Sequence, residues 1–571
     1  MKKIKGYFIL ILAAAVMSGC SGLNKMKKNA DLVKYEVTPK VLEAHGGQVG
    51  VTVKGTFPEK YFDKKTTLQI TPVLTYAGGE TAYDRVEVLQ GEKVQANAKV
   101  ISYTGGNFTY TSTVPFNDAM KVSELMLRTT ATRGSQSLDF DPIKLADGVI
   151  ATSTLTEKHG RAVMMKDNFQ RIIPETQMAD IHYMINRSDI RSSELKGEDV
   201  TALKQFIGQV NEDPDRVFKS AVTSSYASPD GKFELNEKLS GNRGTAADKL
   251  IQAEFEKIEA AKSAGFFDAM TTPEDWEGFK TEVEKSNIPD KELILRVLSM
   301  YSDPVVRERE IRNMSNAFEA LKTDILPRLR RSKLMVNVDK IGRTDEQILS
   351  QMRSDPKVLS LEELLYSATL TSDLNERLKF YQASADLFPK CIRAHNNVGL
   401  TYLALGKPDD ALVAFEKAKA LQNNDVVKNN LGMAYLAKGE LAKAEEQYAS
   451  MTASTPESRW GLGVIAVSKG EYDQAVNYYG TESNYNLAHA QLLKGDVNRA
   501  KATLDAIQGT EKTSRVSYLK AVVGARLDDR NYMLTNLREA MASDPAWKTY
   551  ARTDVEFAKF FSDDAFRAAV Q

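Results

Sequence analysis

Cysteine, tryptophan and net charge are what this chain has least of. Its 571 residues include two cysteines, Cys20 and Cys391, and three tryptophans. Since Cys20 is expected to be modified, as argued below, no disulfide within the mature chain is predicted, and stability must come from packed cores. Lysine plus arginine and aspartate plus glutamate each total 76, so the formal net charge is zero. No basic field that would attract nucleic acid is therefore expected.

Sequence motifs of catalysis and metal binding are missing as well. The five histidines do not fall at ligand spacing, so no metal site is predicted. A phosphate-binding Gly-x-x-x-x-Gly-Lys-Ser/Thr loop and a Gly-x-Ser-x-Gly turn do not occur. Cys391 is interpreted as a small packing residue, because a nucleophile needs a base and an orienting group beside it. The sequence therefore predicts a protein that is not an enzyme and holds no cofactor.

The apolar stretch near the N-terminus covers about residues 7–16. It is shorter than the roughly 20 residues that span a bilayer, so it is interpreted as part of a signal peptide. The tetrapeptide MSGC that ends at Cys20 resembles the bacterial lipobox. The resemblance implies a lipoprotein signal peptide over 1–19, lipid attachment at Cys20 and a lipidated linker over 20–30. The alternative is a plain secretory signal with a chance cysteine.

The residues after Cys20 bear on the membrane in which the anchor lies. Ser21 stands where the inner-membrane retention signal of proteobacterial lipoproteins has Asp, and no acidic cluster resembling the surface-export signal of Bacteroidetes lipoproteins follows. Several acyl chains on one terminus suffice for stable anchoring. We therefore expect a lipid anchor in the outer membrane, with the protein facing the periplasm.

Residues 31–150 alternate apolar and polar side chains with a period of two. Val49, Val51 and Val53 form one such run, and Phe108 and Tyr110 belong to another. Clusters of glycine and proline separate the runs. This pattern predicts an antiparallel β-sandwich of immunoglobulin-like size.

Strand and helix patterns alternate over 175–340. Strands are predicted over 179–186, 217–227 and 332–338, and a helix follows each of the first two. A helical insertion is predicted over about 257–325, ahead of the last strand. This order indicates a central α/β domain.

The stretch YASPDGKFELNEKLSGNRG, residues 226–244, joins the second of these strands to the second helix. It resembles the core motif of the OmpA-like domain, in which a strand and a turn are followed by Asn-x-x-Leu-Ser-x-x-Arg at the start of a helix. Asn236 and Arg243 match the Asn and the Arg of this pattern. Ser228 stands where the family has Asp, and Asp230 lies two residues on.

This resemblance implies contact with peptidoglycan, because the family's Asp and Arg together hold the zwitterionic end of diaminopimelate. The corresponding set here is Ser228, Asp230, Asn236 and Arg243, in which Asp230 would have to replace the missing acid. The SPDG form of the turn, with the helical insertion, resembles OmpA-like domains of the Bacteroidetes. In the alternative interpretation, Arg243 is an ion-pair partner on the helix surface and Asn236 is a local cap.

The pattern over 345–571 is helical and repeats itself. Gly399 and Tyr402 recur 33 residues later as Gly432 and Tyr435, each pair in the form Gly-x-x-Tyr. This spacing resembles the tetratricopeptide repeat. About six repeats and a terminal cap are expected, which implies an all-α solenoid with a concave groove.

The groove is expected to bind a protein partner. Arg393, Asn396 and Asn429 lie on its predicted inner helices beside Leu403 and Leu436. A mixed polar and apolar surface of this kind suits a peptide or a helix.

Together the three regions favour a non-enzymatic scaffold of the cell envelope, with a role in envelope or secretion-machinery assembly. The alternative is a nutrient- or glycan-binding lipoprotein similar to the SusD family, which also has tetratricopeptide-like helices. SusD proteins stack sugars on aromatic side chains in long loops. The compact repeats and the three tryptophans of this chain count against that alternative.

Overall fold

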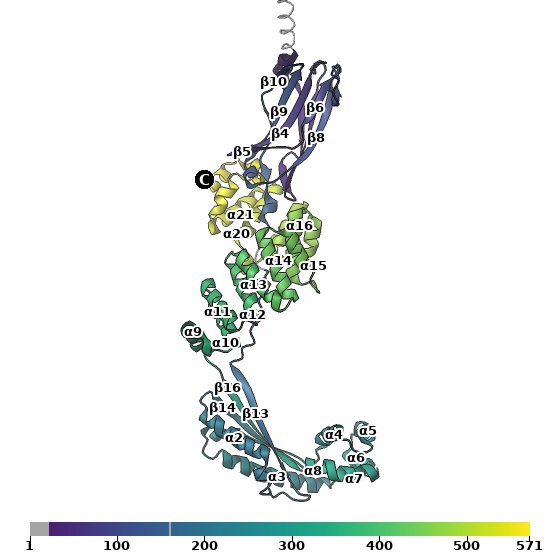
Figure 1. Ribbon diagram of the computed structural model, residues 1–571, viewed down its shortest axis with the longest axis vertical. Coiled ribbons are helices and arrows are strands. Elements are labelled where there is room, and N and C mark those ends of the chain that lie inside the picture. Colours follow the sequence, from purple (N-terminus) through teal and green to yellow (C-terminus); the bar gives the residue numbers. More distant parts are fainter. Residues whose placement is uncertain (1–21, 159–160, 314) are drawn as a thin grey trace, which may run out of the picture. The chain divides into compact units, whose positions relative to one another are not determined.

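Figure 1 shows the computed structural model of the chain, which describes residues 22–158, 161–313 and 315–571. The expected signal peptide over 1–19 and Cys20 lie outside the described residues. The chain divides into two compact units, one formed by the residues up to Lys166 together with Asp373–Gln571, the other by Asp167–Ser372. Among the described residues, no helix is long and apolar enough to cross a membrane.

The N-terminal part of the first unit is a two-sheet sandwich. One sheet has the strand order β1-β3-β2-β12, with β8 also paired to β3, and the other has the order β10-β9-β4-β6-β7, with β11 on β9 and β5 on β4. Most neighbours are antiparallel, as predicted, but β12 runs parallel to β2 and β7 parallel to β6. The strands are β1 (Lys34–Thr38), β2 (Leu42–His45), β3 (Gln48–Phe57), β4 (Thr67–Tyr76), β5 (Gly79–Ala82), β6 (Glu87–Gly91), β7 (Lys99–Ile101), β8 (Gly106–Pro115), β9 (Ser123–Arg133), β10 (Gln136–Asp139), β11 (Ile143–Asp147) and β12 (Val149–Ile150).

Alternation along the strands fills the core between these sheets. Val49, Val51 and Val53 on β3 are buried against Leu68 and Leu125 of the second sheet. Side chains of successive residues point to opposite faces of a sheet, so a period of two places one set inside. The predicted alternation is therefore the pattern that the core uses.

The C-terminal part of the first unit is a series of antiparallel helix pairs. Gly399 lies under the ring of Phe415 and Gly432 under the ring of Tyr448, so closely that an added Cβ would lie 2.5 and 2.6 Å from ring atoms. The glycines thus let the two helices of each pair approach. The helices are α11 (Leu374–Leu387), α12 (Ile392–Ala404), α13 (Pro408–Leu421), α14 (Asp425–Lys438), α15 (Leu441–Ala449), α16 (Pro456–Lys469), α17 (Tyr472–Tyr479), α18 (Tyr485–Lys494), α19 (Val497–Ala506), α20 (Ser514–Arg526), α21 (Arg530–Ser543), α22 (Ala546–Ala551) and α23 (Asp564–Val570).

Sandwich and helix pairs belong to one unit because they pack together. His45 meets the ring of Tyr472 edge-on at 4.8 Å between ring centroids. Gly46, with φ of +56°, lies so close to the carbonyl of Lys469 that an added Cβ would be 2.7 Å from its oxygen. A glycine is required there both by the backbone conformation and by the contact.

The second unit contains a four-stranded sheet in the order β13-β16-β14-β15. β16 is antiparallel to both of its neighbours, and β15 is parallel to β14. Helices α2 and α3 bury one face of this sheet in a common apolar core. The elements are β13 (Ile172–His182), α2 (Glu198–Glu212), β14 (Arg216–Tyr226), α3 (Phe233–Glu254), β15 (Phe267–Thr272), α4 (Trp276–Lys285), α5 (Lys291–Met300), α6 (Pro304–Arg312), α7 (Ser315–Ala320), α8 (Leu326–Leu329) and β16 (Arg331–Ile341).

Two boundaries in this unit differ from the prediction. Strand β15 lies inside the range 257–325 that we expected to be helical, so the run of helices begins with α4. The helices α9 (Asp345–Ser354) and α10 (Leu361–Ser367) belong to the second unit, whereas we expected the repeats to begin at residue 345. Phe169 stacks on Tyr366 of α10 with ring centroids 4.4 Å apart, which ties these helices to the chain that leads into β13.

Candidate functional site

The groove of the helix pairs is occupied by the chain itself. The described residues 151–158 and 161–166, here called the strap, follow the sandwich and lie along helices α12, α14, α18 and α20. Hydrogen bonds join the strap to asparagine, histidine, tyrosine and arginine side chains of these helices.

Three asparagines each hold both main-chain groups of one strap residue. Asn397 accepts from the N–H of Met165 at 3.0 Å and donates to its carbonyl at 2.8 Å. Asn430 makes the same pair of bonds to Val163 at 2.7 and 2.8 Å. Asn486 makes it to Glu157 at 3.0 and 2.9 Å. A carboxamide that pairs with one residue in this way makes the two hydrogen bonds that a neighbouring β-strand would otherwise make. It recognises the main chain, whatever the side chain of that residue is.

The groove residues predicted from the sequence also contact the strap. Asn396 donates to the carbonyl of Val163 at 3.1 Å, and Asn429 donates to the carbonyl of Arg161 at 3.1 Å. Arg393 donates to the carbonyl of Lys166 at 3.4 Å. These three side chains, which we expected to hold a partner, hold the protein's own chain. That they also hold a partner stays a prediction, because a sequence pattern locates a groove but not what fills it.

The asparagines form a ladder with the period of the repeat. Asn396 and Asn397 recur after 33 residues as Asn429 and Asn430, and Asn430 donates to the Oδ1 of Asn396 at 2.8 Å. A further step of 33 leads to Gly463, which has no side chain to donate. The Oδ1 of Asn429 is accordingly buried without a hydrogen-bond partner among the described residues. Pairs of adjacent asparagines that recur at the repeat period indicate a polar ligand in the groove, because buried polar side chains on an inner helix face need hydrogen-bond partners. Sequence reasoning missed this signal.

At its other end the strap is fixed by side chains of α18 and α20, of which those of Tyr485 and His489 are buried. His489 faces the carbonyl of Thr152 with its Nε2 at 2.8 Å, and Tyr485 and Arg515 both donate to the carbonyl of Leu155, at 2.9 and 3.0 Å. His489 is fully buried, and this burial lowers its pKa to about 4. The imidazole is therefore neutral at physiological pH, and Nε2 carries the proton that it donates.

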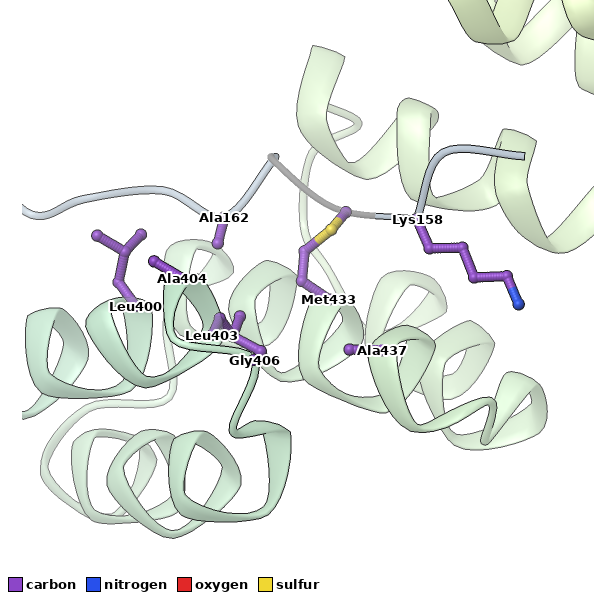
Figure 2. Close-up of a pocket in the computed structure, with 8 residues that line it drawn as sticks. All are labelled: Lys158, Ala162, Leu400, Leu403, Ala404, Gly406, Met433 and Ala437. Carbon is purple, nitrogen blue, oxygen red and sulfur yellow. The ribbon is translucent and has the colours of Figure 1, made fainter. Parts of the chain in front are cut away.

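Beside the strap lies an apolar cavity of about 480 Å³. Its lining residues are Lys158, Ala162, Leu400, Leu403, Ala404, Gly406, Met433 and Ala437. Figure 2 shows Ala162 of the strap pointing toward Leu400 and Ala404 of α12, with Met433 of α14 farther along. The strap thus supplies part of the wall, through Lys158 and Ala162 among the described residues.

The turn between β14 and α3 holds the other predicted site. Arg243 is 1% exposed and has the largest fully buried side chain in the described chain. It donates to the carbonyl of Tyr226 at 2.9 Å, to that of Arg187 at 3.0 Å and to that of Met184 at 3.5 Å. Burial lowers its pKa to about 10, and the guanidinium stays charged at neutral pH. The surface ion pair considered for Arg243 is not formed, since all its hydrogen-bond partners are main-chain carbonyls.

Ser228, Asp230 and Asn236 lie together at the same turn. The carboxylate of Asp230 accepts from the hydroxyl of Ser228 and lies 3.3 Å from a nitrogen of Arg330. Asn236, inside the first turns of α3, donates to the carbonyls of Ser228 and Gly231 at 3.1 and 3.2 Å. It ties the turn to the helix and does not cap it, since the N-cap is Lys232 and no side-chain capping bond forms there. The structure brings the predicted set to one turn, where Arg330, a residue that sequence reasoning missed, neutralises the acid.

Comparison with known families supports one part of this description. A family model of the tetratricopeptide repeat matches residues 402–464, from α12 to α16. The C-terminal region carries tetratricopeptide repeats. The spacing of their glycines and aromatic rings, described above, is that of the helix pairs in this family.

Individual relatives are similar to the chain over limited stretches. The BBSome complex member BBS4 of Bos taurus is 27% identical over 130 residues, which cover 22% of this chain and 25% of that protein. The chain therefore spans about a quarter of the length of this curated relative.

Two solved structures are similar to part of the chain. A tetratricopeptide repeat protein from Parabacteroides merdae has a TM-score of 0.32 at 18% identity, over 37% of this chain and 90% of that one. The pilF protein of Pseudomonas aeruginosa has a TM-score of 0.30 at 14% identity, over 39% and 100%. At these scores neither likeness carries an argument about function.

Proposed function

We propose that this protein is a non-enzymatic scaffold of the cell envelope, a lipoprotein held in the outer membrane by lipid on Cys20 and facing the periplasm. The observation that carries the scaffold role is the repeat groove, whose asparagines bind the main chain of a peptide segment. Tetratricopeptide repeats are typical of non-catalytic proteins that bind other proteins. The lipobox resemblance of residues 17–20 supports the anchor, and it is independent of the repeats.

The anchor is tested by fractionating cells that express the full chain or its Cys20→Ser variant. The wild type should sediment with outer membranes, and the variant should remain in the soluble periplasmic fraction or keep its signal peptide. Equal distribution of both proteins in the outer membrane would contradict lipid anchoring at Cys20.

In this proposal the repeats bind a protein partner during assembly of the envelope or of secretion machinery. Partner capture is tested by affinity purification from cross-linked cells, with the full chain beside Arg393→Glu and the matched control Lys417→Glu on the outer helix α13. Arg393→Glu should reduce the yield of the captured protein at least several-fold at an unchanged melting temperature. Identical yields from all three chains would remove Arg393 from the partner site, and no captured protein from any chain would contradict the scaffold role.

We propose further that the second unit is an OmpA-like module that associates with peptidoglycan. Support comes from Ser228, Asp230 and Asn236, which lie together at one turn; the buried guanidinium of Arg243 already donates to main-chain carbonyls and holds this turn in place. Because Asp230 is already neutralised by Arg330, a diaminopimelate ammonium group has to compete for this carboxylate. Binding is therefore expected to be weak in the wild type and stronger where a second acid is supplied.

The cell-wall proposal is tested by co-sedimentation of the full chain with purified sacculi, with free diaminopimelate as competitor. Ser228→Asp restores the acid that the resemblance leads one to expect, and it should increase the sedimented fraction. Ser228→Asn is the control of similar size without charge. If neither the wild type nor Ser228→Asp sediments, the module is a spacer and does not bind the wall. A glycan-binding role of the SusD type is not favoured, because the repeats are compact helix pairs.

A further inference from the structure

The strap presents one set of main-chain groups to the groove and a second set away from it. Val163 and Met165 have their N–H and carbonyl groups bound by Asn430 and Asn397. The N–H and carbonyl groups of the alternate residues, Ala162 and Met164, have no hydrogen-bond partner anywhere in the described chain. Met164 is 39% exposed. One edge of the strap is therefore paired and the other is open, as in the outermost strand of a sheet.

The apolar cavity adjoins this open edge. Ala162 lines it from the strap, and Leu400, Leu403 and Met433 line it from α12 and α14. A volume of about 480 Å³ exceeds what one methyl group fills. An open strand edge next to an apolar pocket is the arrangement by which sheet edges bind peptides, with main-chain bonds for affinity and a pocket for one side chain.

The charged side chains around the open edge indicate the sign of the charge that a ligand should carry. Lys158, Arg161 and Lys166 are exposed strap residues, and none of them forms an ion pair with a carboxylate of the described residues. Glu157 is the one acidic residue among 157–166. The strap therefore offers uncompensated positive charge on both sides of Ala162 and Met164, and an acidic peptide complements it.

We propose that the strap and the repeats form a composite binding site for an extended acidic segment of a partner protein. The segment pairs with the main chain of Ala162 and Met164, places one large apolar side chain in the cavity, and sets its carboxylates beside Lys158 and Arg161. This inference rests on the proposed scaffold function and specifies its ligand. The asparagine ladder then builds the site by holding the strap, and it does not contact the ligand.

The test uses a phage-displayed library of random twelve-residue peptides, selected on the mature full-length chain. Enriched peptides should carry net negative charge and alternate acidic with apolar residues. Synthetic copies of the enriched peptides should bind at least tenfold more weakly to Met164→Pro, which removes the free N–H, than to Met164→Ala, which keeps it. Ala404→Phe should fill the cavity and weaken binding to a similar degree, whereas Val413→Phe on the exposed face of α13 should not.

The proposal is overturned if no peptide is enriched, if the enriched peptides have no negative bias, or if Met164→Pro and Ala404→Phe bind them as well as their controls do. Circular dichroism and melting of each variant show whether a loss of binding comes from unfolding. Failure of this site can be told from failure of the scaffold role. In the first case, cross-linked cells still yield a partner, with a yield that Ala404→Phe does not change.

Discussion

The repeat groove and the β14–α3 turn both contain buried polar side chains that the sequence marks as ligand-binding, and in both places these side chains hold the protein's own main chain. They differ in what they hold. Asn430 binds Val163, 267 positions away along the chain, whereas Arg243 binds the carbonyl of Tyr226, 17 positions away. Arg243 also binds the carbonyls of Arg187 and Met184, 56 and 59 positions away. The groove thus fastens a segment from a distant part of the chain, and the turn is fastened to the loop that follows β13 in its own unit. Buried polar residues identify where a chain must be held, and only the structure shows which segment is held.

Loss of Arg243 is expected to have the largest effect on stability. Arg243→Ala leaves three carbonyls without their donor in a dry site and opens a cavity, at a cost of about 3 kcal/mol in the free energy of unfolding. Chemical denaturation of the full chain, followed by a probe in the second unit, measures this cost. Lys249→Ala on the exposed face of α3 is the control and should change little. A cost for Arg243→Ala no larger than that of the control would mean that the turn is not held by this side chain.

Lowering the pH should reduce the stability of the groove through His489, which has no counterpart at the turn. The pKa of His489 falls from 6.5 to about 4 on burial, so between these values the unfolded chain binds a proton that the folded chain does not. The stability contributed by neutral His489 is fully present above pH 6.5 and decreases as the pH falls toward 4. The decrease amounts to about 3 kcal/mol.

Comparison with His489→Gln isolates this effect from other groups. The pKa of Asp554 is raised to about 6 by burial, so its contribution has the opposite sign: it is lost as the pH rises through 6. Subtracting the variant's pH profile from that of the wild type removes this contribution. A difference between the two profiles that does not vary between pH 6.5 and 4 would contradict a buried neutral His489.

The same substitution in both regions sharpens the comparison. Asn430→Ala removes a donor and an acceptor from Val163 and a donor from Asn396, and should lower the free energy of unfolding of the first unit by about 2 kcal/mol. Asn423→Ala, at an exposed position in the preceding loop, is the control. The strap should also become a site of proteolysis in Asn430→Ala, and an uncut strap with unchanged stability would count against the ladder.

The corresponding change at the turn is expected to be smaller. Asn236→Ala removes donated bonds to two carbonyls, those of Ser228 and Gly231, and no accepted bond, at a cost of about 1 kcal/mol. Urea denaturation beside Asn242→Ala, an exposed position on α3, gives the difference. If Asn236→Ala costs more than Asn430→Ala, the ranking of the two regions is reversed.

Regular patterns made parts of the fold predictable. Alternation of Val49, Val51 and Val53 predicted a buried strand face, and the 33-residue spacing of Gly399 and Gly432 predicted the helix pairs. Strand β15 was missed because it is a short edge strand in which four of six residues are exposed, so it has no buried alternation.

The contents of the site could be predicted far less well than its location. The strap has no helical or strand period, and its side chains are mostly not what the groove binds. A segment that is bound through its main chain needs no particular side chains, so its sequence has no pattern that would identify it. The pattern that indicates the contact lies in the helices that bind the strap, in the adjacent asparagines Asn396 and Asn397 and their copies one repeat later. Arg330 was missed for the same reason, since the structure alone brings it beside Asp230 from 100 positions away.

The central claim is that the asparagine ladder holds alternate residues of the strap inside the groove. Residue-resolved hydrogen exchange of the full chain tests it most directly, at Val163 and Met165 against Ala162 and Met164. The account predicts slow exchange for the amides of Val163 and Met165, near-intrinsic exchange for those of Ala162 and Met164, and loss of protection at Val163 in Asn430→Ala. Equally fast exchange at all four amides of the wild-type chain would show that the groove is empty in solution, and it would contradict the account.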